Sequence, residues 1–296
     1  MQKLAHQIER IFPHRSYQDD PSTDGSAEPQ PKDQTIPTTS STNNQTYNMT
    51  NLAGKIALVT GGSKGIGRAT CLALAKAGAS VVVNYSSDAG SADAVVKEIG
   101  QERALAVKAD AGSVEGAEQM VKSTLDRFGK LDILIANAGI LPMKDIENTT
   151  EADFDAAYRL NVKGPYFLVQ KAAPHMSAGS HIVLLSTTLC HASTVTPNYL
   201  LYCSTKGAIE QMTKVLSKDL GRKGVSVNAV APGPTGTELF YKGKSEQVLN
   251  MIAGFNPHNR IGTPEEVADA CVFLSGEGSR WVTGQVLGVN GGMASV

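Results

Sequence analysis

The sequence predicts an α/β protein with a doubly wound architecture: one parallel sheet of about seven strands, covered by helices on both faces. Short apolar runs recur from residue 55 to the end of the chain, and most are followed by a segment with helical periodicity. Nearly continuous apolar character is typical of strands that are buried on both faces. The 296 residues, 41% of them hydrophobic, suffice for one large domain with a sizeable core.

The expected strands are four to six residues long and rich in Val, Ile, Leu and Ala. The second one reads SVVVN, a β-branched run that favours extended backbone. In chain order we predict strands over Lys55–Thr60, Ser80–Asn84, Ala104–Lys108, Leu131–Ala136, His181–Leu185, Ser226–Val230 and Gln285–Val289.

The expected helices lie between these strands, and several have recognisable ends. The first follows a glycine-rich turn and runs through Ala77, where Gly78 ends it, and Gly129 ends another. Pro264 occupies the first turn of the last helix, where a missing N–H costs nothing. After the first helix we predict Ser91–Gly100, Val114–Phe128, Glu151–Leu160, Val162–Met176, Tyr199–Leu220 and Glu265–Ser275.

The first fifty residues differ in composition from the rest of the chain. They hold five of the thirteen prolines, and residues 35–50 read TIPTTSSTNNQTYNMT, with almost nothing to bury. Such a segment cannot offset the entropy lost on ordering, so we predict a disordered tail over residues 1–50 and a single domain over 51–296. The tail has neither the apolar core of a secretory signal nor an Arg-rich face, and we expect a cytoplasmic protein.

Charge and cysteine usage exclude several classes of function. The net charge of -1 lacks the basic excess of a nucleic-acid or membrane-surface binder, and no apolar run is long enough for a membrane span. The four cysteines show no C-x-x-C spacing, and no His/Cys cluster predicts a metal site. We therefore expect free thiols in a reducing compartment.

A glycine-rich loop between the first strand and the first helix is the first chemical signal. Thr60–Gly67 reads TGGSKGIG, and glycines at Gly61, Gly65 and Gly67 let the backbone turn tightly and approach a pyrophosphate. The helix that follows presents free N–H groups and the positive end of its dipole to the phosphates. The loop therefore predicts a dinucleotide site, with the spacing G-x3-G-x-G.

The end of the second strand bears on the choice of dinucleotide. NAD sites place a carboxylate there for the adenosine ribose, whereas Asn84–Ser87 (NYSS) holds no acid before Asp88. Lys64 and Arg68 add positive charge nearby. These features favour NADPH over NADH.

A tyrosine and a lysine one helical turn apart are the second chemical signal. Tyr202 and Lys206 lie on one face of the long helix. An ammonium beside a phenol favours the phenolate, so we expect a lowered pKa for Tyr202 and proton exchange with a substrate oxygen.

From about Leu52 to its end, the chain resembles the classical short-chain dehydrogenase/reductase family, a group of Rossmann-type enzymes. Its finer resemblance, in Thr194–Gln211, is to 3-oxoacyl-reductase-like and polyketide-ketone-reductase-like members. The resemblance rests on the TGxxxGxG motif at Thr60–Gly67, an NNAG-like motif at Ala136–Gly139 with Ala first, YxxxK at Tyr202 and Lys206, a PG turn at Pro232-Gly233, and an Asn in a helix at Asn161.

The resemblance implies reduction of a ketone to a secondary alcohol with NADP(H), in which Tyr202 donates the proton. Lys206 would lower the pKa of Tyr202 and bind the nicotinamide ribose, and Asn161 would hold a water that relays protons to Lys206. A catalytic hydroxyl is expected after the fifth strand, where Thr187 occupies the position by strand register, with Ser186 or Thr188 as alternatives. The residues expected at the cofactor are Gly61, Ser63, Lys64, Gly65, Ile66, Gly67, Asn84, Tyr85, Ser86, Asp110, Ala111, Asn137, Ala138, Gly139, Tyr202, Lys206, Pro232, Gly233, Thr235 and Thr237.

The substrate pocket is expected at Leu141–Ile146, Leu189–Tyr199 and Thr235–Asn259. The apolar residues of the last segment suit a bulky ketone such as an aromatic polyketide; the alternative is a helical lid that packs on its own domain. Of the histidines, which we interpret as surface or satisfied side chains, His191 lies closest to the predicted site. The C-terminal VTGQVLGVNGG resembles the segment through which family members assemble, so a homotetramer or dimer is expected. Two alternatives stay open: an NAD-dependent alcohol dehydrogenase, and a catalytically silent dinucleotide-binding protein.

Overall fold

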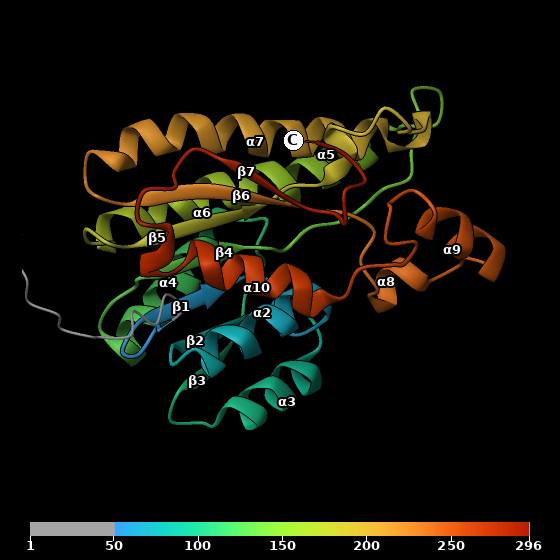
Figure 1. The fold of residues 1–296 in the computed structure, drawn as a ribbon. Helices are drawn as coiled ribbons and strands as arrows, with labels where there is room; N and C mark the ends of the chain where they lie inside the picture. The colour runs from blue at the N-terminus through green and yellow to red at the C-terminus, as the bar shows by residue number, and fades with distance from the viewer. Residues whose placement is uncertain (1–50, 296) are drawn as a thin grey trace, which may run out of the picture. The chain divides into compact units, whose positions relative to one another are not determined.

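A computed structural model describes residues 51–295; the predicted N-terminal tail lies outside the described residues. The described chain forms one parallel seven-stranded sheet in the order β3-β2-β1-β4-β5-β6-β7, flanked by helices (Figure 1). This confirms the doubly wound α/β fold. The strands are β1 (Ile56–Val59), β2 (Ser80–Tyr85), β3 (Ala104–Lys108), β4 (Ile133–Ala136), β5 (His181–Leu185), β6 (Ser226–Pro232) and β7 (Val286–Val289).

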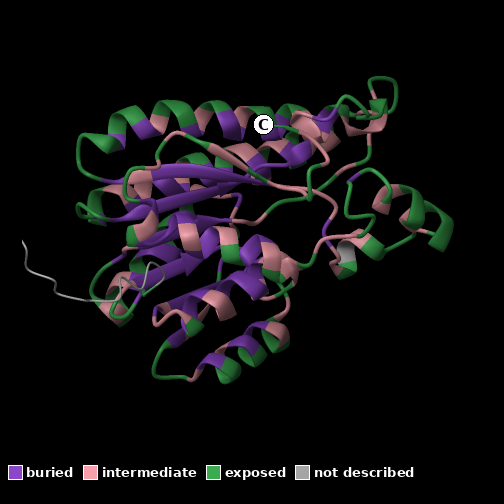
Figure 2. Ribbon diagram, viewed as in Figure 1, coloured by how far each residue is buried: buried purple, intermediate pink, exposed green. Residues whose placement is uncertain are grey.

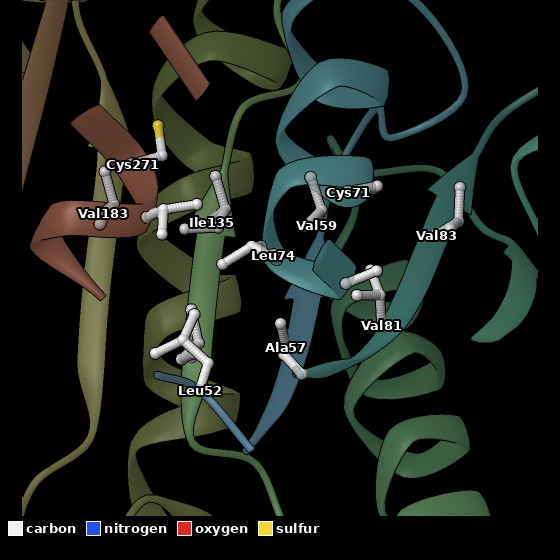
Figure 3. Close-up of a cluster of buried hydrophobic side chains, with 14 of the residues drawn as sticks. Leu52, Ala57, Val59, Cys71, Leu74, Val81, Val83, Ile135, Val183 and Cys271 are labelled. Carbon is white, nitrogen blue, oxygen red and sulfur yellow. The ribbon is translucent and has the colours of Figure 1, made fainter. Parts of the chain in front are cut away.

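The central strands are buried on both faces, because alternate residues enter two different cores. In β1, Ala57 and Val59 belong to one core, whereas Leu58 belongs to the other. The first core packs against α2 (Gly65–Lys76), α3 (Ala89–Ile99) and α10 (Pro264–Leu274), as Figure 3 shows in part. The second packs against α4 (Val114–Phe128), α6 (Gly164–Ala172) and α7 (Leu200–Gly221). Figure 2 shows the resulting buried sheet between helices with exposed outer faces.

Local sequence signals fix the helix ends. Ser113 caps α4 by accepting a hydrogen bond from the Gly116 amide, and Gly129 ends it in the left-handed conformation. Thr263 and Glu266 form a capping box at α10, next to Pro264 in the first turn. These elements match the ranges predicted from the sequence to within one or two residues.

Two regions differ from the prediction. The expected helices Glu151–Leu160 and Val162–Met176 are joined into one path by a π-helical turn, Arg159–Lys163, between α5 (Glu151–Tyr158) and α6. Within the expected pocket rim, two short helices follow β6: α8 (Glu238–Tyr241) and α9 (Glu246–Ala253). They lie apart from the sheet, beside the carboxyl end of β6 (Figure 1).

The strand order places the site. The chain winds outward from β1 to β3 and then returns to β4 on the other side of β1, so the order reverses between β1 and β4. Loops at the carboxyl ends of neighbouring strands diverge at such a point and leave a crevice for a ligand. Between residues 51 and 295, no helix combines the length and apolar character that crossing a bilayer requires.

Candidate active site

The glycine loop after β1 is folded tightly against the loop after β4. Gly61 and Gly65 have φ angles of +62° and +52°, which side chains other than glycine rarely adopt. A Cβ on Gly67 would lie 2.1 Å from the Gly61 carbonyl oxygen, so only glycine fits there. The loop then runs into the N-terminus of α2, whose first N–H groups lack partners within the helix. Ser63 and Ile66 belong to the same loop and first turn.

Three polar side chains, those of Thr60, Asn84 and Asn137, hold this loop in place by hydrogen bonds. Asn137 donates from Nδ2 to the Thr60 carbonyl (2.9 Å), and the Thr60 hydroxyl accepts from the Asn137 and Ala138 amides. Buried Asn84 accepts from the Gly61 amide and donates to the carbonyls of Val107 and Ala109. Asn84 and Asn137 thus shape the loop through their side chains. The bracing role of Thr60 was not predicted, although its position in the TGxxxGxG motif marked the residue.

The two cations expected near the cofactor are both paired. Lys64 lies 2.6 Å from Asp88, and Arg68 lies 2.6 Å from Glu98. The hydrogen bond and charge of Asp88 raise the pKa of Lys64 above its ordinary value, with Glu238 adding to the effect. Tyr85 and Ser86 follow β2 directly, as expected, but the positive charge beside them is partly neutralised.

Residues of α7 contact the end of β5 and the loop that follows it. The Lys206 ammonium donates to the Leu185 carbonyl at 2.6 Å, and its Nζ lies 5.8 Å from the centre of the Tyr202 ring. The Thr187 hydroxyl lies close enough to the Tyr202 phenol to act on its pKa. The structure therefore brings Tyr202, Lys206 and Thr187 together, as the resemblance implied.

The pKa of Tyr202 differs from the expectation. Although part of the residue stays exposed, desolvation of the phenol raises its pKa above the ordinary value of 10, and the Thr187 hydrogen bond only partly opposes this. Lys206 is not among the causes, because burial acts on the lysine itself and lowers its pKa to about 8. The predicted lowering of the Tyr202 pKa by Lys206 is therefore wrong for the protein without cofactor.

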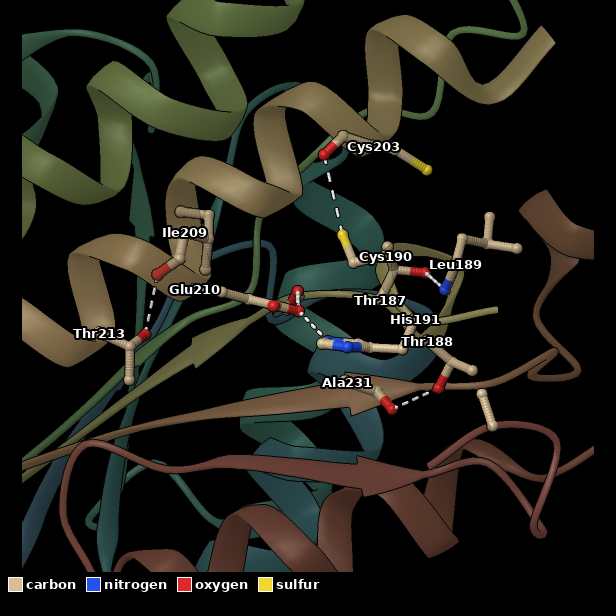
Figure 4. Close-up of polar contacts among 12 residues, drawn as sticks. Thr187, Thr188, Leu189, Cys190, His191, Cys203, Ile209, Glu210, Thr213 and Ala231 are labelled. Carbon is tan, nitrogen blue, oxygen red and sulfur yellow. Dashed lines mark hydrogen bonds and ion pairs between the residues drawn. The ribbon is translucent and has the colours of Figure 1, made fainter. Parts of the chain in front are cut away.

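The neighbours of Thr187 face elsewhere. The Ser186 hydroxyl donates to Glu210 at 2.7 Å. The Thr188 hydroxyl donates to the Ala231 carbonyl (Figure 4) and accepts from Asn290 Nδ2. Of the three candidates for the catalytic hydroxyl, only Thr187 acts on the pKa of Tyr202.

Asn161 lies in the π-helical turn and is fully buried. It binds both backbone groups of Ile140, accepting from the amide and donating to the carbonyl, each at 2.9 Å. It also donates to the Thr205 hydroxyl. A Cβ on Gly139 would lie 3.1 Å from Asn161 Oδ1 and 3.6 Å from Lys206 Nζ, so the loop after β4 passes close to both side chains.

The remaining predicted cofactor residues lie around the same edge of the sheet. Asp110, followed by Ala111, accepts from the Gly112 amide and pairs with Arg159, and both interactions lower its pKa. Pro232 ends β6, and the Gly233 amide donates to Val289. Thr235 donates to the Gly233 carbonyl, and Thr237 caps α8. A Cβ on Gly65 would lie 3.1 Å from the Thr237 methyl group, which places this segment against the glycine loop.

Several large apolar side chains near these loops are exposed. They come from all three segments predicted for the pocket rim: Leu141, Met143, Val195, Tyr241, Met251 and Phe255. Exposed apolar residues on segments that border a polar site are typical of a surface that receives an apolar ligand.

Sequence reasoning missed the part-buried pair of Glu210 and His191. Glu210 lies on α7 one turn after Lys206, and its carboxylate is 2.9 Å from His191 Nε2. The i+4 spacing from Lys206 was a usable signal, but the pairing with His191 depends on the tertiary fold.

Comparison with known proteins decides the family. The family model described as enoyl-(acyl carrier protein) reductase matches residues 61–294. Versicolorin reductase 1 of Dothistroma septosporum is 36% identical over 254 residues, which cover 81% of this chain and 96% of that protein. Hydroxynaphthalene reductase-like protein Arp2 of Metarhizium anisopliae is 38% identical over 255 residues, or 81% and 95% of the two chains.

The chain belongs to the short-chain dehydrogenase/reductase family.

Solved structures agree with this assignment. A short-chain dehydrogenase of Burkholderia cenocepacia, solved in complex with NADP, superposes with a TM-score of 0.78 at 34% identity, covering 82% of this chain and 99% of that one. A blue fluorescent protein from a metagenomic library, solved with NADPH, has the same TM-score at 32% identity and covers 83% of this chain and 100% of that one. This short-chain dehydrogenase/reductase is therefore an oxidoreductase that acts on CH–OH and C=O groups.

Proposed function

We propose that this short-chain dehydrogenase/reductase reduces a ketone to a secondary alcohol with NADPH, and that Tyr202 donates the proton. The single observation that carries the proposal is the pair of side-chain hydroxyls of Tyr202 and Thr187, next to the buried Lys206 ammonium. Two neighbouring hydroxyl donors suit a carbonyl oxygen that gains negative charge during reduction.

The residues around the glycine loop fit a dinucleotide. The positive φ angles and the close approach of Gly67 to Gly61 leave backbone unshielded by side chains at the N-terminus of α2, the arrangement that favours a pyrophosphate. We therefore assign the phosphate contacts to Gly61–Gly67 and the nicotinamide end to Lys206, Gly139 and Thr235–Thr237. The relatives solved with NADP and NADPH support the same cofactor.

When bound, NADPH supplies the hydride that the carbonyl carbon accepts. Thr187 would hold the carbonyl oxygen, and the Tyr202 phenol would give that oxygen its proton. Because desolvation raises the pKa of Tyr202, the phenol keeps its proton at neutral pH, which suits an acid in the reducing direction. Lys206, whose pKa is lowered to about 8, would return a proton to Tyr202 after each turnover.

The substrate class follows from the apolar rim and from the relatives. Exposed Leu141, Tyr241 and Phe255 favour a bulky, largely apolar ketone. The fungal relatives are named versicolorin reductase and hydroxynaphthalene reductase-like protein, and hydroxynaphthalene is a fused aromatic compound. We therefore propose an aromatic polyketide-type ketone, in secondary metabolism.

One observation favours a second candidate, an NAD-dependent alcohol dehydrogenase. Lys64 and Arg68 are each paired with an acid, so less positive charge is free to bind the 2′-phosphate of NADPH. A panel of aromatic and aliphatic ketones, followed by loss of nicotinamide absorbance, tests both candidates. We expect turnover with NADPH at least tenfold faster than with NADH; the reverse order would favour the second candidate, and no turnover with any ketone would refute the first.

We also propose that the chain assembles as a homotetramer or dimer. In addition to the C-terminal resemblance, α5 and α6 expose Phe154 and Tyr166 beside a shallow groove lined by Tyr158, Val162 and Phe167. Light scattering coupled to size-exclusion chromatography would detect a monomer, which would contradict the proposal.

A further inference from the structure

Glu210 is a buried carboxylate that the mechanism above does not use. It lies on α7 eight residues after Tyr202 and four after Lys206, so all three side chains project from one face of the helix. Only 7% of Glu210 is exposed. Its Oε1 atom accepts from the Ser186 hydroxyl at 2.7 Å and lies 2.9 Å from His191 Nε2 (Figure 4).

Both partners of Glu210 belong to the same short turn after β5, and Thr187 lies between them. Within that turn the Thr187 hydroxyl accepts from the Leu189 amide, and the His191 amide donates to the Thr188 carbonyl. Glu210 therefore fastens both ends of the segment Ser186–His191 to α7. We call this arrangement the Glu210 clasp: Glu210, Ser186 and His191.

The clasp contact lies between two of the proposed catalytic contacts along the chain. Three consecutive residues meet α7 at three different turns: Leu185 at Lys206, Ser186 at Glu210 and Thr187 at Tyr202. A buried carboxylate is costly unless its lone pairs are satisfied. Loss of either donor leaves Oε1 undersatisfied and releases one end of the turn.

We propose that Glu210 and His191 are positioning residues, which hold the Thr187 hydroxyl against Tyr202. The proposal rests on the proposed function in one respect: the consequence for turnover exists only if Thr187 and Tyr202 act on a carbonyl oxygen. The consequence for the structure of the turn does not depend on any activity.

Matched substitutions separate positioning from packing. Glu210→Gln keeps an oxygen acceptor of the same size, whereas Glu210→Leu removes it; His191→Gln keeps an N–H donor, whereas His191→Leu removes it. We expect the leucine variants to lose kcat by about 10- to 100-fold, since small misplacements of reacting groups have effects of this size. The glutamine variants should recover most of that loss, and the dissociation constant of NADPH should stay within about twofold. The control Glu118→Leu, which breaks an exposed ion pair with Lys171, should leave kcat unchanged.

A double-mutant cycle with Thr187→Ala provides the decisive kinetic readout. If Glu210 acts through Thr187, Glu210→Leu should lower kcat less than about twofold once the Thr187 hydroxyl is gone. The positioning role would be overturned if the losses of kcat from Glu210→Leu and Thr187→Ala multiplied in the double variant. It would also be overturned if the leucine and glutamine variants lost kcat equally.

Hydrogen exchange tests the clasp without turnover. In Glu210→Leu and His191→Leu, the amides of residues 187–191 should exchange at least about tenfold faster, while those of α4 stay unchanged. Unchanged exchange in this turn would overturn the proposal even in an active enzyme. A wild-type protein that reduces no ketone but shows the faster exchange in these variants would refute the proposed function and leave the clasp supported.

Discussion

The ammonium of Lys206 donates a 2.6 Å hydrogen bond to the carbonyl oxygen of Leu185, the last residue of β5. The contact joins the second turn of α7 to the strand that leads into Thr187, and only 5% of Lys206 is exposed. Among residues 51–295, no carboxylate pairs with this buried ammonium. The Leu185 carbonyl replaces part of its lost hydration, and desolvation lowers the pKa of the lysine to about 8.

Replacement of this lysine should change the pH dependence of stability. Because the folded-state pKa of about 8 lies below the ordinary 10.5, the unfolded state binds more protons between these values. The wild-type free energy of unfolding should therefore gain a contribution on the order of 3 kcal/mol as the pH rises from 8 to 10.5. Lys206→Met should lack that gain, as urea unfolding across this pH range would measure. Equal slopes for the two proteins would contradict the assigned pKa.

Tyr202→Phe should abolish turnover without loss of cofactor binding. The substitution removes only the hydroxyl that donates the proton, so kcat should fall by at least about 100-fold. Titration of the variant with NADPH, followed by nicotinamide fluorescence, should give a dissociation constant close to that of the wild type. Unchanged turnover would remove Tyr202 from the mechanism.

Substitution of the three adjacent hydroxyl residues should separate their roles. Thr187→Val removes the hydroxyl next to the Tyr202 phenol, and we expect a loss of about 100- to 1,000-fold in kcat, as for an oxyanion donor. Thr187→Ser should retain most activity. Thr188→Ala is the matched control, since that hydroxyl binds Ala231 and Asn290. A larger loss in Thr188→Ala than in Thr187→Val would reassign the donor.

His181 should make the protein less stable in mild acid. Burial, followed by the charge of Lys55, lowers its pKa below 6.5, and Nδ1 has no hydrogen-bond partner among the described residues. The folded state therefore resists the proton that the unfolded state binds as the pH falls through 6.5, so stability should drop below that pH. Thermal unfolding of His181→Gln between pH 7 and 5.5 should show a smaller drop than the wild type. A drop of the same size in both proteins would argue against this residue as its source.

Much of the sheet could be predicted, because each strand carries its own signal. Ala104–Lys108 and His181–Leu185 match β3 and β5 to the residue, as continuous apolar runs bounded by polar residues. Val114–Phe128 matches α4, since Ser113 and Gly129 mark its ends. The segment containing α8 and α9 was identified only as a pocket rim, because helices of four and eight residues have too few turns to give a clear period.

The sequence predicted which motif residues meet in the candidate site, but it did not predict their desolvation or their ion pairs. The spacing of Tyr202 and Lys206 shows that the side chains are neighbours, but only the fold shows that both are desolvated. The partners of Lys64 and Arg68 are acids 24 and 30 residues away in sequence (88 − 64 and 98 − 68), at positions that no local pattern connects.

The Glu210 clasp ends at His191, and α7 begins at Leu200. Both ends of the intervening loop are therefore held in place. Ala192 is buried and its amide donates to the Thr188 carbonyl, whereas residues 193–197 are exposed and can vary without moving Thr187. Directed evolution of new ketone specificities would do best to randomise or exchange residues 193–197 as a cassette, leaving the anchors on either side intact.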